Sequence, residues 1–201
     1  MSLVNIRIVD DCAYIAVDTA MCAIPSNDSF EGTKLLVLPG PNVVLAARGD
    51  VAFAKRIFLQ YLLRSETQDY DSIAKGLKST VRKEMDLYDN FQRSHGNTDP
   101  QTGSAEIYLV GWSKRAGKPA ACQVKRAGGS VEKEDLESSI TAPGISANLG
   151  GARVNGYEGL MMLFAQHQVA EFKSTGLPLG GRLIFAKLTK DEISIRDLGE
   201  I

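Results

Sequence analysis

Apolar and polar residues alternate over the first part of the chain, which is the pattern of β-strands. Residues 4–9 (V-N-I-R-I-V) alternate, and residues 13–18 (A-Y-I-A-V-D) form a second β-prone run after a D-D turn. The runs K-L-L-V-L and N-V-V-L-A-A follow, separated by P-G-P, where proline forces a turn because it cannot continue a hydrogen-bonded ladder. The pattern predicts two successive β-hairpins.

Beyond residue 50 the apolar period changes to three and four residues, which indicates helices. The first helix extends for roughly four turns, and Asp50 is well placed as its N-cap. A second amphipathic helix is predicted from about residue 70 to 93. Its apolar stripe comprises Ile73, Leu77, Val81, Met85 and Tyr88. Both helices fit a layer that covers one face of a sheet.

The second half of the chain contains two more predicted hairpins with one helix between them, and no internal repeat is evident. A-E-I-Y-L-V-G-W and A-A-C-Q-V-K-R form a third predicted hairpin, a helix is expected from about 153 to 172 after the pair Gly150-Gly151, and R-L-I-F-A-K-L-T with E-I-S-I-R-D-L forms a last hairpin. Strand hairpins separated by helices indicate an α+β fold with antiparallel sheets rather than alternating βαβ units. We expect two stacked sheets with helices outside, in a single domain over residues 1–201.

Composition and charge indicate which classes of binding partner are disfavoured. The chain of 201 residues is 44% apolar and has 23 basic and 24 acidic residues, for a formal net charge of −1. Nucleic acid is disfavoured because no clustered basic surface is evident. No apolar run approaches the ~18 residues of a membrane-spanning helix, and the first residues lack the pattern of a signal peptide. We therefore expect a cytoplasmic protein that does not bind membranes.

Cysteine and histidine residues do not form a metal-binding pattern. The three cysteines, Cys12, Cys22 and Cys122, are odd in number and lack C-x-x-C spacing, so reduced thiols are expected rather than a disulfide framework. His95 and His167 have no ligand companions at short spacing. Neither a metal nor a cofactor is expected.

Two charged residues at predicted strand ends are the more informative candidates. Asp18 ends the second strand and Lys34 begins the third. Each taken alone fits a solvated strand end, but if the two hairpins pack together, both approach the start of the chain, where Ser2 lies. The R-G-D tripeptide at 48–50 is interpreted as a strand-to-helix junction rather than as an adhesion motif. Gly150-Gly151 fits either an anion-binding turn or a sharp connection into a helix.

The order of these segments resembles proteasome β-type subunits and their bacterial relatives. The likeness covers D-D-C-A-Y-I-A-V-D-T-A, G-T-K-L-L-V-L, N-V-V-L-A-A-R-G-D-V-A, the central hairpin with its acidic sequel, and R-L-I-F-A-K-L-T-K-D-E-I-S-I. The resemblance implies an N-terminal nucleophile (Ntn) hydrolase fold, a four-layer αββα sandwich whose subunits assemble into stacked rings.

The resemblance also implies roles for individual residues. The family's threonine nucleophile falls on Ser2, whose own α-amino group serves as general base. Lys34 keeps the local potential positive, Asp18 orients Lys34, and the oxyanion-hole N–H falls near Arg48 and Gly49. The implied catalytic set is Ser2, Asp18, Lys34 and Gly49.

The sequence departs from the family pattern at several points. Serine replaces threonine, and it follows Met1, which must be removed; alternatively M-S-L is an expression remnant, with no native residue at position 2. The family's serine before the third helix falls near Gly150 and Gly151, and its late Asp-x-x-Ser-Gly element is absent from S-T-G-L-P-L-G-G. These departures leave the activity open.

Three functions fit these observations. The first is a peptidase or amidohydrolase that cleaves amide bonds through residue 2, with a peptide or unfolded protein as substrate. The second is a catalytically inactive, ring-forming structural subunit of the same fold, and the third is an amide ligase or transferase. All three are compatible with a homo-oligomeric ring.

Overall fold

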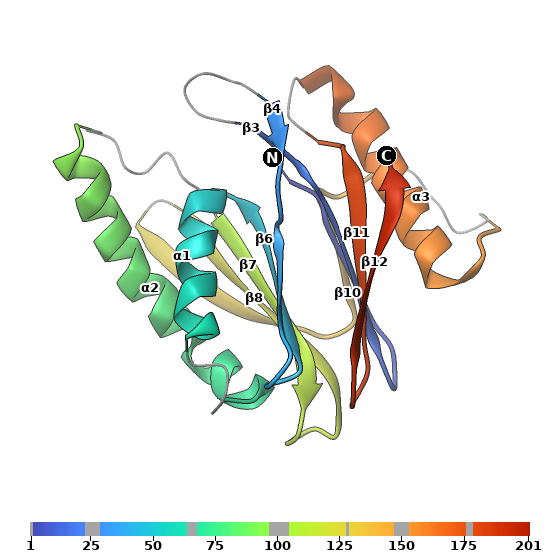
Figure 1. The fold of residues 1–201 in the computed structure, drawn as a ribbon, viewed down its shortest axis with the longest axis horizontal. Coiled ribbons are helices and arrows are strands. Elements are labelled where there is room, and N and C mark those ends of the chain that lie inside the picture. Colours follow the sequence, from blue (N-terminus) through green and yellow to red (C-terminus); the bar gives the residue numbers. More distant parts are fainter. Residues whose placement is uncertain are drawn as a thin grey trace.

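Two antiparallel sheets of five strands each lie face to face, with helices on their outer faces (Figure 1). This computed structural model describes residues 2–22, 29–63, 68–96, 105–127, 129–146, 153–175 and 179–201. The predicted arrangement of two stacked antiparallel sheets flanked by helices is confirmed.

The first sheet contains both ends of the described chain and has the order β10-β1-β2-β11-β12. Its strands are β1 (Val4–Ile8), β2 (Ala13–Asp18), β10 (Ser139–Ala142), β11 (Arg182–Leu188) and β12 (Ile193–Glu200). β1 pairs with β2 and β11 pairs with β12, as the alternating sequence runs predict. β2 and β11 join these two hairpins, so the C-terminal hairpin completes the sheet that the N-terminus begins.

The second sheet has the order β5-β6-β7-β8-β9, so each strand pairs with its neighbour in sequence. Its strands are β5 (Leu35–Leu38), β6 (Val43–Gly49), β7 (Ala105–Ser113), β8 (Lys118–Ala127) and β9 (Ser130–Leu136). A short ribbon of β3 (Ala20–Cys22) and β4 (Ser29–Glu31) extends beyond the sandwich between the two sheets.

The helices cover the two sheets unequally. α1 (Val51–Leu62) and α2 (Tyr70–Ser94) lie on the second sheet, and α3 (Gly156–Phe172), followed by a 3-10 turn at Lys173–Thr175, lies on the first (Figure 1). α3 begins three residues later than the sequence predicts.

Both helices on the second sheet begin at an aspartate cap. Asp50 accepts a hydrogen bond from the backbone N–H of Phe53 at 3.0 Å, which confirms the predicted N-cap of α1. Asp69 accepts from the N–H of Ser72 at 3.0 Å, and the Ser72 hydroxyl accepts from the N–H of Asp69 at 2.9 Å. This reciprocal capping satisfies N–H groups that the first helical turn leaves unpaired.

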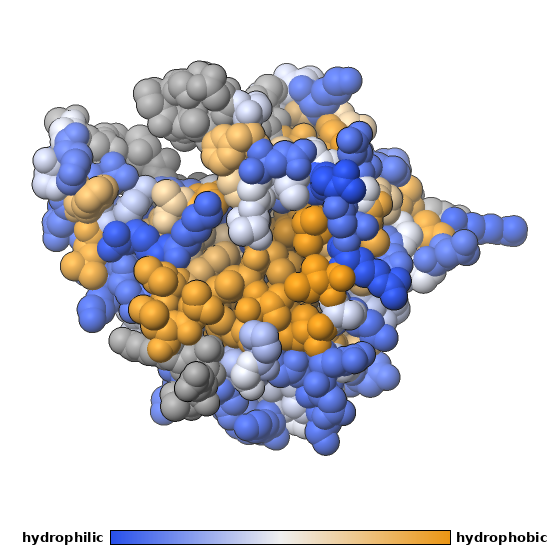
Figure 2. All heavy atoms as spheres, in the orientation of Figure 1, coloured by the Kyte–Doolittle hydropathy of each residue, from blue (hydrophilic) through white to orange (hydrophobic). Residues whose placement is uncertain are grey.

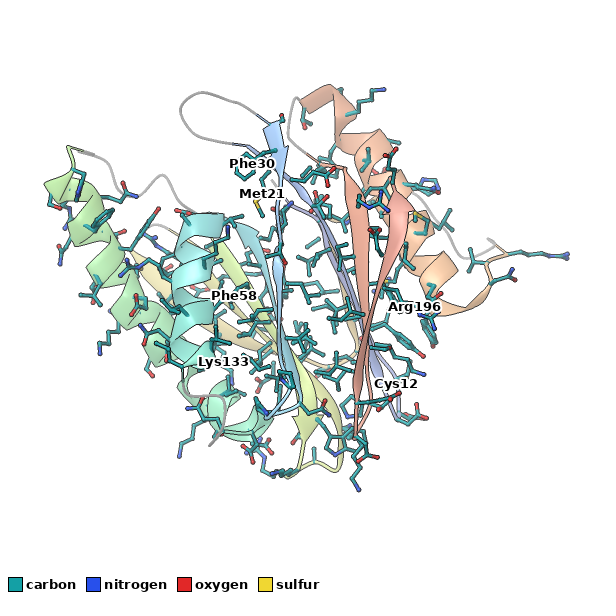
Figure 3. The ribbon with its side chains drawn as sticks, viewed as in Figure 1. Cys12, Met21, Phe30, Phe58, Lys133 and Arg196 are labelled. Carbon is teal, nitrogen blue, oxygen red and sulfur yellow. The ribbon has the colours of Figure 1, made fainter. Side chains whose placement is uncertain are left out.

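Three apolar clusters hold the layers together, and one of them fills the space between the sheets (Figure 3). Between the sheets lie Val4, Ile6, Ile15, Val17, Val44, Ala46, Tyr108, Val110, Ala186 and Leu188. Between the second sheet and its helices lie Leu45, Ala47, Phe53, Ile57, Ile73, Leu77, Ile107, Leu109 and Val124. The smaller cluster under α3 contains Leu3, Ala16, Met161, Ala165, Leu183 and Phe185.

Hydrophobic side chains also reach the surface. Figure 2 shows them gathered across the middle of one face of the molecule, in the region between α1 and β12. Large apolar side chains that are exposed on these two elements and just after α1 include Leu59, Leu62, Leu63 and Ile195. An exposed apolar surface of this kind is typical of an interaction site.

Four of the strands were not predicted from the pattern. β9 lies in the acidic segment after the central hairpin, with only Val131 buried, and β10 follows that segment. β3 and β4 have three residues each, too few for alternation to be recognised. Gly150-Gly151 lies outside the described residues. Within the described residues, no helix is long and apolar enough to span a membrane.

Candidate functional site

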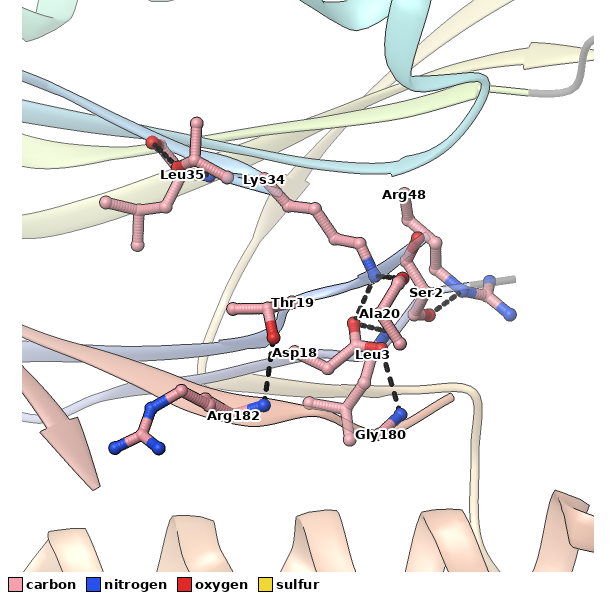
Figure 4. Close-up of polar contacts among 11 residues, drawn as sticks. Ser2, Leu3, Asp18, Thr19, Ala20, Lys34, Leu35, Arg48, Gly180 and Arg182 are labelled. Atoms are coloured by element: carbon pink, nitrogen blue, oxygen red, sulfur yellow. Dashed lines mark hydrogen bonds and ion pairs between the residues drawn. The ribbon is translucent and has the colours of Figure 1, made fainter. Parts of the chain in front are cut away.

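A buried ion pair joins the two sheets at the end where the chain begins. The Nζ atom of Lys34 lies 2.7 Å from Oδ1 of Asp18, and both side chains are fully buried. The Lys34 ammonium also donates a hydrogen bond to the carbonyl oxygen of Ala20. Figure 4 shows Lys34 reaching from the second sheet towards Asp18.

The order of elements along the chain explains why Asp18 and Lys34 lie side by side. Asp18 is the last residue of β2, in the first sheet, and Lys34 directly precedes β5, at the edge of the second. The carbonyl oxygen of Lys34 accepts a hydrogen bond from the N–H of Ala47 at 2.9 Å, which fixes its backbone against β6. The side chain therefore crosses the gap between the sheets from a fixed starting point.

The first residues of the chain lie directly against this ion pair. The N–H of Leu3 donates to Oδ1 of Asp18 at 2.8 Å, and Nε of Arg48 donates to the carbonyl oxygen of Ser2 at 2.8 Å (Figure 4). Leu3 is fully buried in the cluster under α3, and Val4 is buried between the sheets. Because successive residues of an extended chain face opposite sides, Ser2 shares the inner side with Val4. Ser2 is 3% exposed.

Burial and the attraction between the two charges have opposite effects on the pKa values of Lys34 and Asp18. Burial lowers the pKa of Lys34, and the neighbouring Asp18 carboxylate partly offsets this effect. Burial likewise raises the pKa of Asp18, against the attraction of Lys34 and the N–H groups of Leu3 and Gly180. Desolvation of charged groups is costly unless they are paired and hydrogen-bonded. The donors around Asp18 and the acceptors around Lys34 meet this requirement.

The structure brings together three of the four residues expected from the sequence. Ser2, Asp18 and Lys34 lie in one cluster, linked through the N–H of Leu3. Gly49 follows Arg48 at the end of β6, with a φ of 91°. Its expected part in an oxyanion hole stays a prediction, as do the chemical roles of the other three.

Other residues of the site were missed from the sequence. The N–H of Gly180 donates to Oδ2 of Asp18 at 3.3 Å, so the loop before β11 also reaches the site. Gly181 has a φ of 73°, and a Cβ atom there would lie 2.5 Å from Oγ1 of Thr19. Thr19 Oγ1 also accepts from the N–H of Arg182 at 2.8 Å. The G-G pair before the last hairpin was the available signal, because a close approach of this kind requires glycine.

The described residues contain no group of three or more histidine, cysteine, aspartate and glutamate side chains that could hold a metal ion. Cys12 and Cys122 are buried free thiols, as expected, and burial raises the pKa of Cys122 to about 11. The side chain of Cys22 lies outside the described residues.

Comparisons with known proteins were made by sequence and by structure. No protein-family model and no curated protein matches the chain. Among solved structures, the chain is similar to the Gly-1 mutant of Anbu from Hyphomicrobium sp. strain MC1, with a TM-score of 0.68 and 15% sequence identity over 99% of this chain and 88% of that one. Identity this low shows the fold alone. The chain has a proteasome-like Ntn-hydrolase fold.

Proposed function

We propose that this protein hydrolyses amide bonds with Ser2 as an N-terminal nucleophile, once Met1 has been removed. The observation that carries the proposal is the buried Lys34–Asp18 pair, which is bonded through Asp18 to the N–H of Leu3. A buried lysine and carboxylate against the start of the chain, on a proteasome-like fold, support this chemistry over a purely structural role.

The proposed reaction has two halves. The free α-amine of Ser2, whose ordinary pKa is about 8, accepts the hydroxyl proton while Oγ bonds to the substrate carbonyl carbon. The C–N bond of the tetrahedral intermediate then breaks, the leaving amine takes up that proton, and an ester remains on Ser2. Water hydrolyses the ester, which releases the carboxylic acid and restores the serine hydroxyl.

Lys34 supplies positive potential in this scheme. Its ammonium has three N–H donors, and among the described residues Asp18 and Ala20 accept two of them. The third is free to stabilise negative charge that develops on Ser2 Oγ as the hydroxyl loses its proton. Asp18 holds both the ammonium and the N–H of Leu3, which sets the distance between Lys34 and residue 2.

The experiment begins with the mature N-terminus. Intact-mass analysis and N-terminal sequencing of the purified protein should show a free Ser2, and a panel of fluorogenic peptide amides should be turned over. Ser2→Ala should lower turnover about 1,000-fold or more, because the nucleophile is removed. Ser2→Thr should keep a measurable part of the activity, since it retains both hydroxyl and α-amine.

Two controls make this result specific. Ser79→Ala removes an exposed hydroxyl on α2 and should leave turnover unchanged. Sizing of the same sample by light scattering tests the accompanying proposal that copies of the chain assemble, which the exposed apolar residues on α1 and β12 support. Turnover by protein that keeps Met1, or full activity of Ser2→Ala, would contradict the N-terminal mechanism.

A further inference from the structure

The peptide group between Ser2 and Leu3 is held from both sides by charged side chains. Its carbonyl oxygen accepts from Nε of Arg48 at 2.8 Å, and its N–H donates to Oδ1 of Asp18 at 2.8 Å. Arg48 belongs to β6 of the second sheet, and Asp18 belongs to β2 of the first. We infer that Arg48 is a positioning residue, which with Asp18 clamps this peptide group and so fixes residue 2 for reaction.

Arg48 is itself held by its neighbour across the sheet. Glu106 lies directly opposite Arg48 in the pairing of β6 with β7. Nη1 of Arg48 lies 3.2 Å from both carboxylate oxygens of Glu106, and the two side chains are 17% and 24% exposed. Hydrogen bonds between ionised groups are stronger than neutral ones, and the planar guanidinium restricts their direction.

Two buried side chains fix Glu106 in turn. The hydroxyl of Tyr108 donates to Oε2 of Glu106 at 2.5 Å, and Nε2 of Gln123 donates to the Tyr108 hydroxyl oxygen at 2.9 Å. Tyr108 and Gln123 are paired residues of β7 and β8, and each is at most 1% exposed. Burial, together with the Glu106 carboxylate, raises the pKa of Tyr108, so its hydroxyl remains a donor.

This network leads from the rigid interior of the second sheet to residue 2. Tyr108 and Gln123 orient Glu106, Glu106 orients Arg48, and Arg48 holds the carbonyl of Ser2. Fixing one peptide plane restricts the backbone dihedrals of the residue before it, on which both the nucleophile and its base depend. The catalytic consequence rests on the proposed function, but the clamp itself does not.

Hydrogen exchange at a single amide tests the clamp without any activity measurement. In protein labelled with ¹⁵N-leucine, the Leu3 amide should exchange about tenfold faster in Arg48→Met than in the wild type, because one side of the clamp is lost. Glu106→Gln should give a smaller increase, since Arg48 keeps its bond to Ser2 but loses its charged support. Arg196→Met, which removes an exposed arginine paired with Glu158, is the matched control and should leave Leu3 exchange unchanged.

The kinetic constants kcat and KM distinguish a positioning role of Arg48 from a role in substrate binding. Arg48→Met should lower kcat about 100-fold with little change in KM, since the residue orients the nucleophile instead of holding substrate. Methylguanidinium should restore part of the kcat of Arg48→Ala, which a general loss of stability would not allow. Circular dichroism confirms that each variant is folded under the assay conditions.

Each outcome has a clear meaning. If Leu3 exchange in Arg48→Met stays within about twofold of the wild type, the clamp is overturned. If exchange rises but kcat does not fall in an active enzyme, the positioning role is overturned. If the wild type has a free Ser2 and turns over no amide, the proposed function fails, while Leu3 exchange still decides whether the clamp exists.

Discussion

The two faces of the second sheet are formed by the same strands but carry side chains with different roles. The outer face packs beneath α1 and α2 and forms the largest apolar cluster of the described residues. The inner face packs against the first sheet, but at one end it carries the polar residues that reach Ser2. The outer face therefore stabilises the fold, and one end of the inner face carries residues of the candidate site.

Two arginines show this difference most directly. Across the sheet, Gly49 of β6 lies opposite Ala105 of β7, which lies opposite Arg126 of β8. Because Arg48 directly precedes Gly49, the two arginines lie within one residue of each other along the strand direction. Arg48 faces the first sheet and contacts Ser2. Arg126 faces the helices, where it is 1% exposed and lies over the ring of Phe53 at 4.9 Å. The alternation of side chains along a strand, not the residue type, separates the two roles.

Asp89→Ala should give the largest loss of stability in this comparison. Asp89 of α2 pairs with Arg126, and Nε and Nη1 of Arg126 have no hydrogen-bond acceptor in the described part of the chain. Removing the partner leaves a buried guanidinium without its counter-charge, which costs about 3 kcal/mol. Urea unfolding followed by circular dichroism measures this difference in the free energy of unfolding.

The double variant Arg126→Met/Asp89→Ala should recover most of that loss, because a buried ion pair can be replaced by apolar side chains at little cost. Both variants should leave Leu3 amide exchange unchanged under conditions where the protein is folded. A change at Leu3 in the stable double variant would show that the two faces are coupled and would break the comparison.

Close packing of the outer face predicts a second, smaller effect. A Cβ atom at Gly111 of β7 would lie 2.6 Å from Cγ1 of Val43 and 2.7 Å from Cδ2 of Tyr70. Gly111→Ala should therefore destabilise the protein by about 2 kcal/mol, because these side chains must shift.

A second glycine in the same layer provides the matched control. Gly76 lies within α2, and apart from the adjoining residues and backbone of its own helix no atom of the described residues lies within 4 Å of the position of a Cβ. Gly76→Ala should stabilise the protein by about 0.5 kcal/mol, since alanine favours helix. Equal effects of the two substitutions on the free energy of unfolding would show that the outer face is less tightly packed than the structure indicates.

The fold was largely predictable from the sequence because its elements are amphipathic. Alternation in β1 and β2, and the three- and four-residue period of α2, follow directly from the faces that these elements bury. β9 escaped prediction because it is an edge strand with one buried residue, so most of its positions carry charge. Edge strands are commonly charged, which removes the apolar signal on which prediction depends.

The candidate site was predictable only in part. Asp18 and Lys34 end or precede strands of hairpins, so packing of the two hairpins was enough to bring them together. The contact between Arg48 and Ser2 depends on the stagger between two stacked sheets, which no local pattern records. Gly180 reaches Asp18 from 162 positions away in the chain, through a backbone N–H that no side-chain pattern identifies.

The start of α2 gives a smaller predicted loss than Asp89→Ala or Gly111→Ala, and it contrasts a partly exposed carboxylate with the buried Asp18. Hydrogen bonds from Ser72 hold the pKa of Asp69 below its ordinary value of 3.8, so the ionised form stabilises the folded state. That contribution is complete above the ordinary pKa and is lost as the pH falls through the lowered folded value. Asp69→Ala should cost about 1 kcal/mol at neutral pH through loss of the cap, and the deficit relative to the wild type should shrink in acid.

Asp69→Asn keeps an acceptor without a titrating group, so it should retain most of the stability and lose this part of the acid dependence. Unfolding free energies of the three proteins across that range measure the effect, and parallel pH curves for the wild type and Asp69→Asn would show that the cap does not depend on charge.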